Sequence, residues 1–393
     1  MHILYHHRTL GDGAEGIHIR EMVKAFSALG NDVTVIGPVV SQDGKVKQKK
    51  SSFFSKVKRG LPTWLVELVE IAYGVFCLMN CLIKIYSDRP HFIYDRYALY
   101  NFGCVLAGRI TSVPVFLEVN APLAWERDYS PDEKLAIKSA AYEFERFICG
   151  CAFKTLVVSS PLKQHLIRSG VPEKKIMVLP NGANPETFKP SNASEEMLHG
   201  FGADGVDAVI GFTGIMRKWH GLELLLEAVS LVRKMGMNVF LLLVGDGPAR
   251  KEIDKYAARL DLTGNYFITG RLPHSMVANY IALFDIAVAP SATFYASPMK
   301  VLEYMAIGKA VVVPNTDNFA DFVDAGVNGE VFEDGNAESM ADVIGSLVKG
   351  KDRCRALAHE ARKKIETRLN WNWNALAVID EFKKINRATT HEF

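Results

Sequence analysis

Short apolar runs alternate with longer helical patterns along most of the chain, and this alternation limits the fold more than any other feature. Six runs come before residue 185, and they read HILYHH, DVTVIGPV, FIYDRY, PVFLEVN, TLVVSS and IMVLPNG. Five more come after residue 206: AVIGFTG, VFLLLVG, YFITG, IAVAPS and AVVVPN. Runs that are apolar throughout are typical of parallel strands buried on both faces. The order therefore predicts an α/β protein with two doubly wound parallel-sheet domains.

The length of 393 residues allows two domains that each bury a core. The stretch 181–200, rich in Asn, Pro, Ser and Gly, separates the two series of strands. We place the first domain at residues 1–185, the linker at 186–205 and the second domain at 206–370. The last helical pattern, residues 371–393, follows the completed second series. It can cap either domain, and a return to the first domain is one of the two possibilities.

Charge and cysteine content exclude several classes of partner. The 46 Lys and Arg residues nearly balance the 44 Asp and Glu residues, so we predict no nucleic-acid partner and expect any anion binding to be local. The six cysteines, including the pairs Cys77 with Cys81 and Cys149 with Cys151, show no repeated metal-ligand spacing. We therefore expect buried free thiols and no metal. The chain opens on a strand pattern without a secretory signal, which predicts a cytoplasmic location.

Residues 45–64 interrupt the α/β pattern. The segment KVKQKKSSFFSKVKR is basic, and it leads into an apolar stretch long enough to span a bilayer by count. Glu67 and Glu70 at the start of that stretch argue against a spanning helix, because carboxylates are costly in hydrocarbon. Two interpretations remain open. One is a buried helix preceded by a solvated basic loop, and the other is peripheral contact with anionic lipid through residues 45–64.

Several strand ends are followed by glycine and then a helix, which is where doubly wound sheets bind ligands. The free N–H groups of such a helix can face an anion, and nearby cations suit a diphosphate. A tight turn that requires glycine, or a solvated loop, is the structural alternative. The candidates are Gly16 after the first strand, Gly214 followed by Arg217, Lys218 and His220, and Gly245.

The stretch SPMKVLEYMAIG contains the most informative helix start. Ser297 is predicted to cap this helix and Pro298 to be its first residue. Lys300 places a cation in the first turn, where the helix dipole disfavours it unless an anion shares the site. Glu303 follows, and its carboxylate can accept two ribose hydroxyls. The alternative for Glu303 is a solvated surface acid.

Taken together, these segments resemble the retaining glycosyltransferases of family 4, also called group 1. The resemblance rests on VGDGPARKEI, YFITGRLPHSMVANYIALFDIAVAPS and SPMKVLEYMAIGKAVVV in this order, with VLPNGANPETFKP and LGDGAEGIHIREMVKAFSALGNDVTVIG before them. It implies the GT-B fold, with two Rossmann-like domains facing across a cleft. It also implies transfer of a sugar from a nucleoside diphosphate to a glycan or lipid-linked acceptor, with retention of configuration and without metal or cofactor.

The resemblance also assigns donor-binding roles residue by residue. Glu303 matches the second Glu of the family's E-x7-E motif, which binds the ribose. Backbone groups near three residues that precede Glu303 would bind the diphosphate, and Gly16 would allow the first domain to approach the diphosphate closely. A two-residue loop would contact the base. These further positions are Ser297, Met299 and Lys300 for the diphosphate and Arg271 with Leu272 for the base.

Two departures from the family affect the turn after Gly214. Where members carry an Arg next to this glycine and a Lys just before the helix glycine, this chain has Ile215 and His220. We expect Arg217 or Lys218 to make the diphosphate contact instead.

Further departures concern the catalytic centre. Tyr295 stands where the first motif Glu would fall, and Asn120 aligns with the family's active-site His. Because Asn is not a base, we expect the leaving phosphate to help deprotonate the acceptor. Glu118 and Asn120 become candidates for holding sugar hydroxyls. Asp95 and Arg96, at another strand end, are candidates for acceptor binding, with structural pairing as the alternative.

Two other functions share this fold. A nucleotide-sugar 2-epimerase would need acid and base groups around the sugar ring, and the sequence supplies few near the matched site. A non-catalytic nucleotide-sugar-binding protein is motivated by Tyr295 and Asn120. The sequence predicts no oligomeric state.

Overall fold

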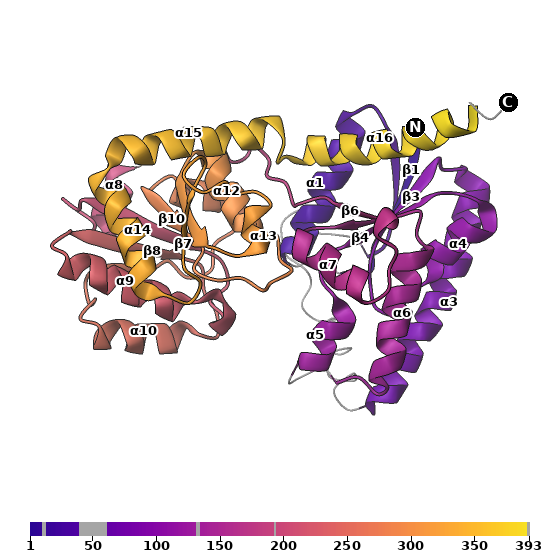
Figure 1. Cartoon of the computed structure of the whole chain (residues 1–393), viewed down its shortest axis with the longest axis horizontal. Helices are drawn as coiled ribbons and strands as arrows, with labels where there is room; N and C mark the ends of the chain where they lie inside the picture. Colours follow the sequence, from indigo (N-terminus) through magenta and orange to yellow (C-terminus); the bar gives the residue numbers. More distant parts are fainter. Residues whose placement is uncertain (10–12, 39–60, 131–133, 192–193, 391–393) are drawn as a thin grey trace. The chain divides into compact units, whose positions relative to one another are not determined.

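The computed structural model describes residues 1–9, 13–38, 61–130, 134–191 and 194–390 (Figure 1). Two compact units divide the chain: Met1–Pro180 with Trp371–Phe393, and Asn181–Asn370. The last helix, α16 (Trp371–Thr390), therefore belongs to the first unit. Helix α8 (Glu195–Phe201) lies within the stretch that the sequence suggested as a linker. It is helical there because Leu198 and Phe201 pack against the core of the second unit.

The first unit is a six-stranded parallel sheet in the order β2-β1-β3-β4-β5-β6. Its strands are β1 (His2–His6), β2 (Asp32–Ile36), β3 (Phe92–Arg96), β4 (Val115–Val119), β5 (Lys154–Val157) and β6 (Ile176–Val178). Its other helices are α1 (Ala14–Ala28), α3 (Thr63–Asp88), α4 (Gly103–Thr111), α5 (Leu123–Tyr129), α6 (Lys138–Cys151) and α7 (Ser160–Arg168). The direction of winding changes between β1 and β3, which places the crevice of this sheet at their carboxyl ends.

Helices cover both faces of the first sheet (Figure 1). On one face Phe92 of β3 packs edge-on against Phe26 of α1, with ring centroids 6.1 Å apart, and against Phe382 of α16 at 5.2 Å. On the other face His6 of β1 meets Cys77 of α3. The alternation of residues along β1 and β3 thus sends apolar rings to one side and His6 to the other.

The second unit is also a six-stranded parallel sheet, in the order β12-β11-β10-β7-β8-β9. Its strands are β7 (Ala208–Thr213), β8 (Val239–Val244), β9 (Tyr266–Ile268), β10 (Ile286–Val288), β11 (Ala310–Pro314) and β12 (Glu330–Phe332). Its helices after α8 are α9 (Leu222–Lys234), α10 (Arg250–Arg259), α11 (His274–Ile281), α12 (Met299–Ile307), α13 (Asp317–Ala320), α14 (Ala337–Lys349) and α15 (Lys351–Thr367). Winding reverses between β7 and β10, the position where dinucleotide-binding sheets open their crevice.

The predicted fold class is confirmed: each unit is a doubly wound parallel sheet with flanking helices. All eleven predicted apolar runs contain a strand. The sequence missed β12, a strand of three residues whose first two side chains are only half-buried. Such a short edge strand lacks the continuous apolar run that identifies the others.

Helix α3 has two different faces. Glu67 and Glu70 are buried, and Arg127 donates to both oxygens of Glu70 at 2.7 and 3.0 Å. By length and composition α3 could cross a membrane, yet these carboxylates face the protein. Its opposite face exposes large apolar side chains, namely Trp64, Leu68, Val69, Val75, Phe76, Met79, Ile83 and Tyr86. The basic segment 45–59 lies outside the described residues.

A buried carboxyl in α6 predicts a pH-dependent stability. Burial raises the pKa of Glu145 to about 7, partly offset by bonds from the Ala124 N–H and the Tyr97 hydroxyl. Because its folded pKa exceeds the ordinary 4.5, the fold is most stable where Glu145 is protonated, and the unfolding free energy falls as pH rises from about 4.5 to 7. Glu145→Gln is expected to abolish this pH-dependent loss of unfolding free energy, which amounts to up to about 3 kcal/mol in the wild type. Thermal unfolding of the wild type and of Glu145→Gln at pH 5 and pH 8 checks this. An equal change of the unfolding midpoint with pH in the two proteins would contradict it.

Candidate active site

The carboxyl ends of β7 and β10 bring together the segments that the sequence singled out in the second unit. Gly214 follows β7, and a loop after β10 leads into α12. The two strands are neighbours, with Ile286 of β10 paired to Ile210 of β7. Because parallel strands end at one edge of the sheet, the Gly214 turn and the start of α12 lie side by side.

The start of α12 differs from the prediction. The helix begins at Met299 after Pro298, and Ser297 does not cap it. Instead, the Ser297 hydroxyl accepts a bond from the Asn181 N–H at 3.1 Å, and the Asn181 side chain donates to the Ser297 carbonyl at 2.7 Å. Within the described residues no side chain caps α12. Its first N–H groups are therefore suited to an anionic ligand.

Lys300 projects from the first turn of α12 toward the end of β7. Its ammonium lies 4.1 Å from the centre of the Phe212 ring, and a Cβ on Gly214 would come within 3.0 Å of it. Gly214 has a φ of +136°, which favours glycine. Burial lowers the pKa of Lys300 to about 7, although the charge of Glu303 raises it in part. An anion beside Lys300 would stabilise the charged form.

Glu303 is not a solvated surface acid, since it is only 8% exposed. Its Oε1 lies 3.1 Å from Nε2 of His274, the first residue of α11. Arg271 and Leu272 directly precede this helix. Arg271 is exposed, and Leu272 packs against the core. The structure thus links the predicted ribose carboxylate to the predicted base-contacting loop through His274, which sequence reasoning missed.

Tyr304 fixes α12 to the end of β7. Its buried hydroxyl accepts a bond from the Thr213 N–H at 2.6 Å and lies 3.0 Å from Thr213 Oγ1. Tyr304→Phe leaves that buried N–H without its partner, so we expect the free energy of unfolding to fall by about 1–3 kcal/mol. Urea denaturation measures this. Tyr280→Phe, which alters a half-buried ring packed against Phe201, is the matched control.

The remaining donor candidates have different roles. Arg217 and Lys218 are exposed, and the Arg217 guanidinium stacks 4.7 Å from the Trp219 ring. His220 Nδ1 lies 2.5 Å from the Ile215 carbonyl, and burial together with the Lys300 charge lowers the pKa of His220 to about 4. His220 is therefore neutral near pH 7 and does not replace the missing Lys as a cation.

Two residues named from the sequence support the site through packing. Gly245 has a φ of +135°, and a Cβ there would come within 2.1 Å of the Gly214 carbonyl. Glycine at this position allows the turn after β8 to lie close to the turn after β7. Tyr295 is buried, with its ring edge-on to Phe294 at 5.1 Å between centroids.

In the first unit, Glu118 anchors a group of polar side chains at the end of β4. The Tyr94 hydroxyl donates to it at 2.8 Å, Arg96 and Asn120 also donate to it, and His18 Nδ1 lies 3.1 Å away. Although burial opposes this, the charges of His18 and Arg96 hold the pKa of Glu118 well below its usual range. Glu118 is thus an ionised anchor that orients Asn120 and Arg96, and its contact with a sugar hydroxyl stays a prediction. His18, on α1, was missed by the sequence reasoning.

Asp95 and Gly16 are both buried. Asp95 is 1% exposed and accepts a bond of 2.6 Å at Oδ1 from His6 Nδ1, so its contacts favour the structural alternative over acceptor binding. Gly16 lies in the first turn of α1, where its N–H donates to the Gly13 carbonyl at 3.0 Å.

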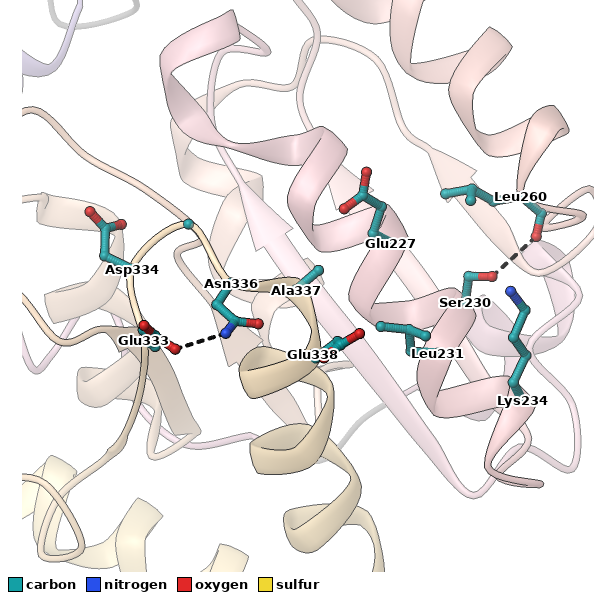
Figure 2. A pocket seen from close by; sticks show the side chains of 11 residues that line it. Glu227, Ser230, Leu231, Lys234, Leu260, Glu333, Asp334, Asn336, Ala337 and Glu338 are labelled. Atoms are coloured by element: carbon teal, nitrogen blue, oxygen red, sulfur yellow. Dashed lines mark hydrogen bonds between the residues drawn. The ribbon is translucent and has the colours of Figure 1, made fainter.

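A surface hollow of about 600 Å³ lies elsewhere on the second unit, between α9 and the start of α14 (Figure 2). The Ser230 hydroxyl donates to the Leu260 carbonyl across it, and Asn336 donates to Glu333. None of the predicted donor residues lines it. Its carboxylates would repel a diphosphate, and they are Glu227, Glu333, Asp334 and Glu338.

Comparison with known proteins identifies the class. The family described as "Glycosyl transferases group 1" matches residues 194–364, and "Glycosyltransferase Family 4" matches residues 15–187. The fold and these matches define a GT-B glycosyltransferase. Together the two matches cover most of the chain, and the chain belongs to the group 1 glycosyltransferases.

Several named relatives share this similarity. The capsular polysaccharide biosynthesis glycosyltransferase CapM of Staphylococcus aureus is 26% identical over 340 residues, which is 84% of this chain and 85% of CapM. The lipopolysaccharide 1,2-N-acetylglucosaminetransferase of Salmonella typhimurium is 25% identical over 55% of this chain and 58% of its own length. The structure of HepE from Anabaena in complex with UDP has a TM-score of 0.72 at 16% identity, covering 98% of this chain and all of HepE.

Proposed function

We propose that this enzyme transfers a sugar from a nucleoside diphosphate to a glycan or lipid-linked acceptor, with retention of configuration and without a catalytic metal or other cofactor. The observation that carries the donor assignment is the pairing of Lys300 with the uncapped start of α12 beside Gly214. A partly buried ammonium and free helix N–H groups offset diphosphate charge, which is the task a metal ion performs in other transferases. Glu303 and His274 follow on the same side and would hold the ribose.

The names of the relatives support a donor and a setting. CapM is a capsular polysaccharide enzyme, the Salmonella relative is named for N-acetylglucosamine transfer, and HepE was solved with UDP and with UDP-glucose. We infer a uridine diphosphate sugar as donor and cytoplasmic assembly of a bacterial surface glycan. The first unit would bind the acceptor near Asn120 and Arg96, which Glu118 holds in place.

Retention fits the residues at the end of β4. Asn120 offers no base, and Glu118 has its oxygens engaged by Tyr94, Arg96 and Asn120. Deprotonation of the acceptor would then fall to the leaving phosphate, which requires attack from the face that the phosphate leaves.

The test is a transfer assay with UDP-glucose, UDP-galactose and UDP-N-acetylglucosamine, each with isoprenoid-linked glycan acceptors. An α-linked product from the α-linked donor, identified by NMR and formed equally with EDTA, is the expected result. A β-linked product would overturn retention, and loss of activity with EDTA in protein whose zinc content is unchanged would overturn metal independence. Donor incubated alone must stay unchanged, because conversion without acceptor would indicate an epimerase.

We also propose that the exposed apolar face of α3 rests on the anionic inner surface of the membrane. The side chains on this face are unusually large and apolar for a solvent-exposed helix, while the carboxylates of Glu67 and Glu70 face the protein. Residues 45–59, which precede α3 in the chain, are basic and complement anionic lipid.

Vesicle sedimentation tests this membrane contact. Phe76→Glu and Ile83→Glu are each expected to reduce binding to vesicles of phosphatidylglycerol and phosphatidylcholine by about tenfold or more, since each buries a charge in the interface. Met235→Glu, which changes an exposed apolar residue of the second unit, is the control. Equal binding by all variants would refute the contact.

A further inference from the structure

Four buried side chains with nitrogen or sulfur ligand atoms meet at the carboxyl end of β1. They come from three elements: His6 from β1, Cys77 and Cys81 from α3, and Cys104 from α4. Cys77 Sγ lies 3.3 Å from His6 Nε2 and 3.9 Å from Cys104 Sγ. The ligand atoms of His6, Cys77 and Cys104 all lie within 4.8 Å of one another. The cluster lies in the first unit and shares no residue with the donor site of the second.

These separations match the edges of a tetrahedral metal site. Zinc binds sulfur at about 2.3 Å and imidazole nitrogen at about 2.0–2.1 Å, which gives edges of about 3.8 Å between two sulfurs and about 3.6 Å between sulfur and nitrogen. The observed 3.9 and 3.3 Å are close to both. One ion can therefore contact all three atoms with small side-chain adjustments.

Cys81 supplies a fourth ligand. It follows Cys77 by one helical turn and so lies on the same face of α3. Its Sγ is 2.7 Å from Cys104 Sγ, which is nearer than the sulfur–sulfur edge of a metal site. A different side-chain rotamer of Cys81 would move its sulfur away from Cys104 Sγ and toward the ion held by the other three residues.

Asp95 provides an independent indication of a ligand. Its Oδ1 lies 2.6 Å from His6 Nδ1, and the carboxylate is 1% exposed. This contact holds a proton on Nδ1, so a metal ion would take the place of the proton on Nε2, which faces Cys77 Sγ. A carboxylate that orients a histidine in this way is the usual outer partner of a metal-binding imidazole.

We propose that His6, Cys77, Cys81 and Cys104 bind one soft tetrahedral metal ion, with Zn²⁺ as the preferred ion and Asp95 as the outer partner of His6. Three thiolates and one imidazole select Zn²⁺ over hard ions such as Mg²⁺. Four protein ligands leave no open position, so the ion is structural and takes no part in transfer. It ties α3 and α4 to the point where the first sheet reverses its winding. Free thiols are what the irregular spacing of the cysteines in the sequence predicts, and all six are free in the structure; the proposed ion would engage three of them.

The experiment measures metal in the full-length protein expressed with zinc and dialysed against EDTA. We expect about one Zn²⁺ per chain by mass spectrometry, and Co²⁺ replacement should give the absorption bands of tetrahedral thiolate coordination. Cys104→Ser is expected to lose the ion, whereas Cys149→Ser, a buried cysteine outside the cluster, should keep it. Zinc retained in Cys104→Ser would place it elsewhere and overturn the proposal.

Two further measurements keep the proposal falsifiable if Cys104→Ser does not fold. Asp95→Asn leaves every ligand in place and should weaken zinc affinity about 10- to 100-fold in competition with a chromophoric chelator; unchanged affinity would refute the outer-partner role. Thiol titration of denatured wild-type protein separates the alternatives. Metal-free protein with six reactive thiols indicates ordinary buried cysteines, and metal-free protein with four indicates a Cys81–Cys104 disulfide. Either result overturns the metal site.

Discussion

Glu303→Ala is expected to raise the dissociation constant for UDP-glucose by at least about 100-fold. The carboxylate would accept two ribose hydroxyls, and hydrogen bonds to a charged group contribute about 1.5–3 kcal/mol each. Its burial and its contact of 3.1 Å with His274 hold it in one orientation, so little entropy is lost on binding. Isothermal titration calorimetry measures the constant directly.

The matched control for this result is Glu338→Ala. Glu338 is also a helix glutamate of the second unit, but it lines the acidic hollow and not the donor site. We expect this variant to bind UDP-glucose like the wild type. A dissociation constant within twofold of wild type for Glu303→Ala would end the ribose assignment.

Lys300 is expected to make donor binding depend on pH. The ordinary lysine pKa of 10.5 is lowered to about 7 in the free protein, so most of the Lys300 population is neutral at pH 8.5. A bound diphosphate favours the ammonium and raises its pKa again. Binding above pH 7 therefore takes up a proton, and affinity for UDP-glucose should fall by up to about tenfold per pH unit between pH 7 and 9.

The lowered pKa of Lys300 also makes the stability of the ligand-free protein depend on pH. Because the unfolded chain holds this proton up to about pH 10.5, the free protein loses unfolding free energy at Lys300 as pH falls from about 10.5 to 7. A bound diphosphate opposes that loss. Stabilisation by ligand should therefore be larger at pH 7 than at pH 9, which thermal shift can measure.

Two substitutions separate the charge of Lys300 from its shape. Lys300→Met keeps the packing over Phe212 but should weaken binding at pH 7 and remove the pH dependence. Lys300→Arg keeps the positive charge at every pH, so its affinity for UDP-glucose, whatever its value, should not change between pH 7 and 9. A pH slope that persists in Lys300→Met would show that another group titrates.

The apolar runs were sufficient to predict the fold because a strand buried on both faces appears in the sequence as an uninterrupted run of apolar residues. Glycine turns at strand ends and the SPMK segment were also visible, since a sharp turn and a helix start depend on neighbouring residues. The prediction that Ser297 caps α12 was wrong, because its hydroxyl accepts a hydrogen bond from the N–H of Asn181, 116 positions earlier in the chain. A cap predicted from neighbours cannot anticipate a competing partner from a distant segment.

Parallel-sheet topology and the positions of Lys300 and Glu303 were therefore determined by the sequence itself, through periodicity, turn chemistry and an unfavourable cation in a first turn. The tertiary structure alone decided which side chains meet them. His274 meets Glu303 across 29 positions, Tyr304 meets Thr213 across 91, and Cys77 meets His6 across 71. Contacts of this kind form only when crossover helices pack onto the sheet, because packing brings together residues that share no local pattern. For that reason three cysteines and one histidine with irregular spacing become a single buried cluster.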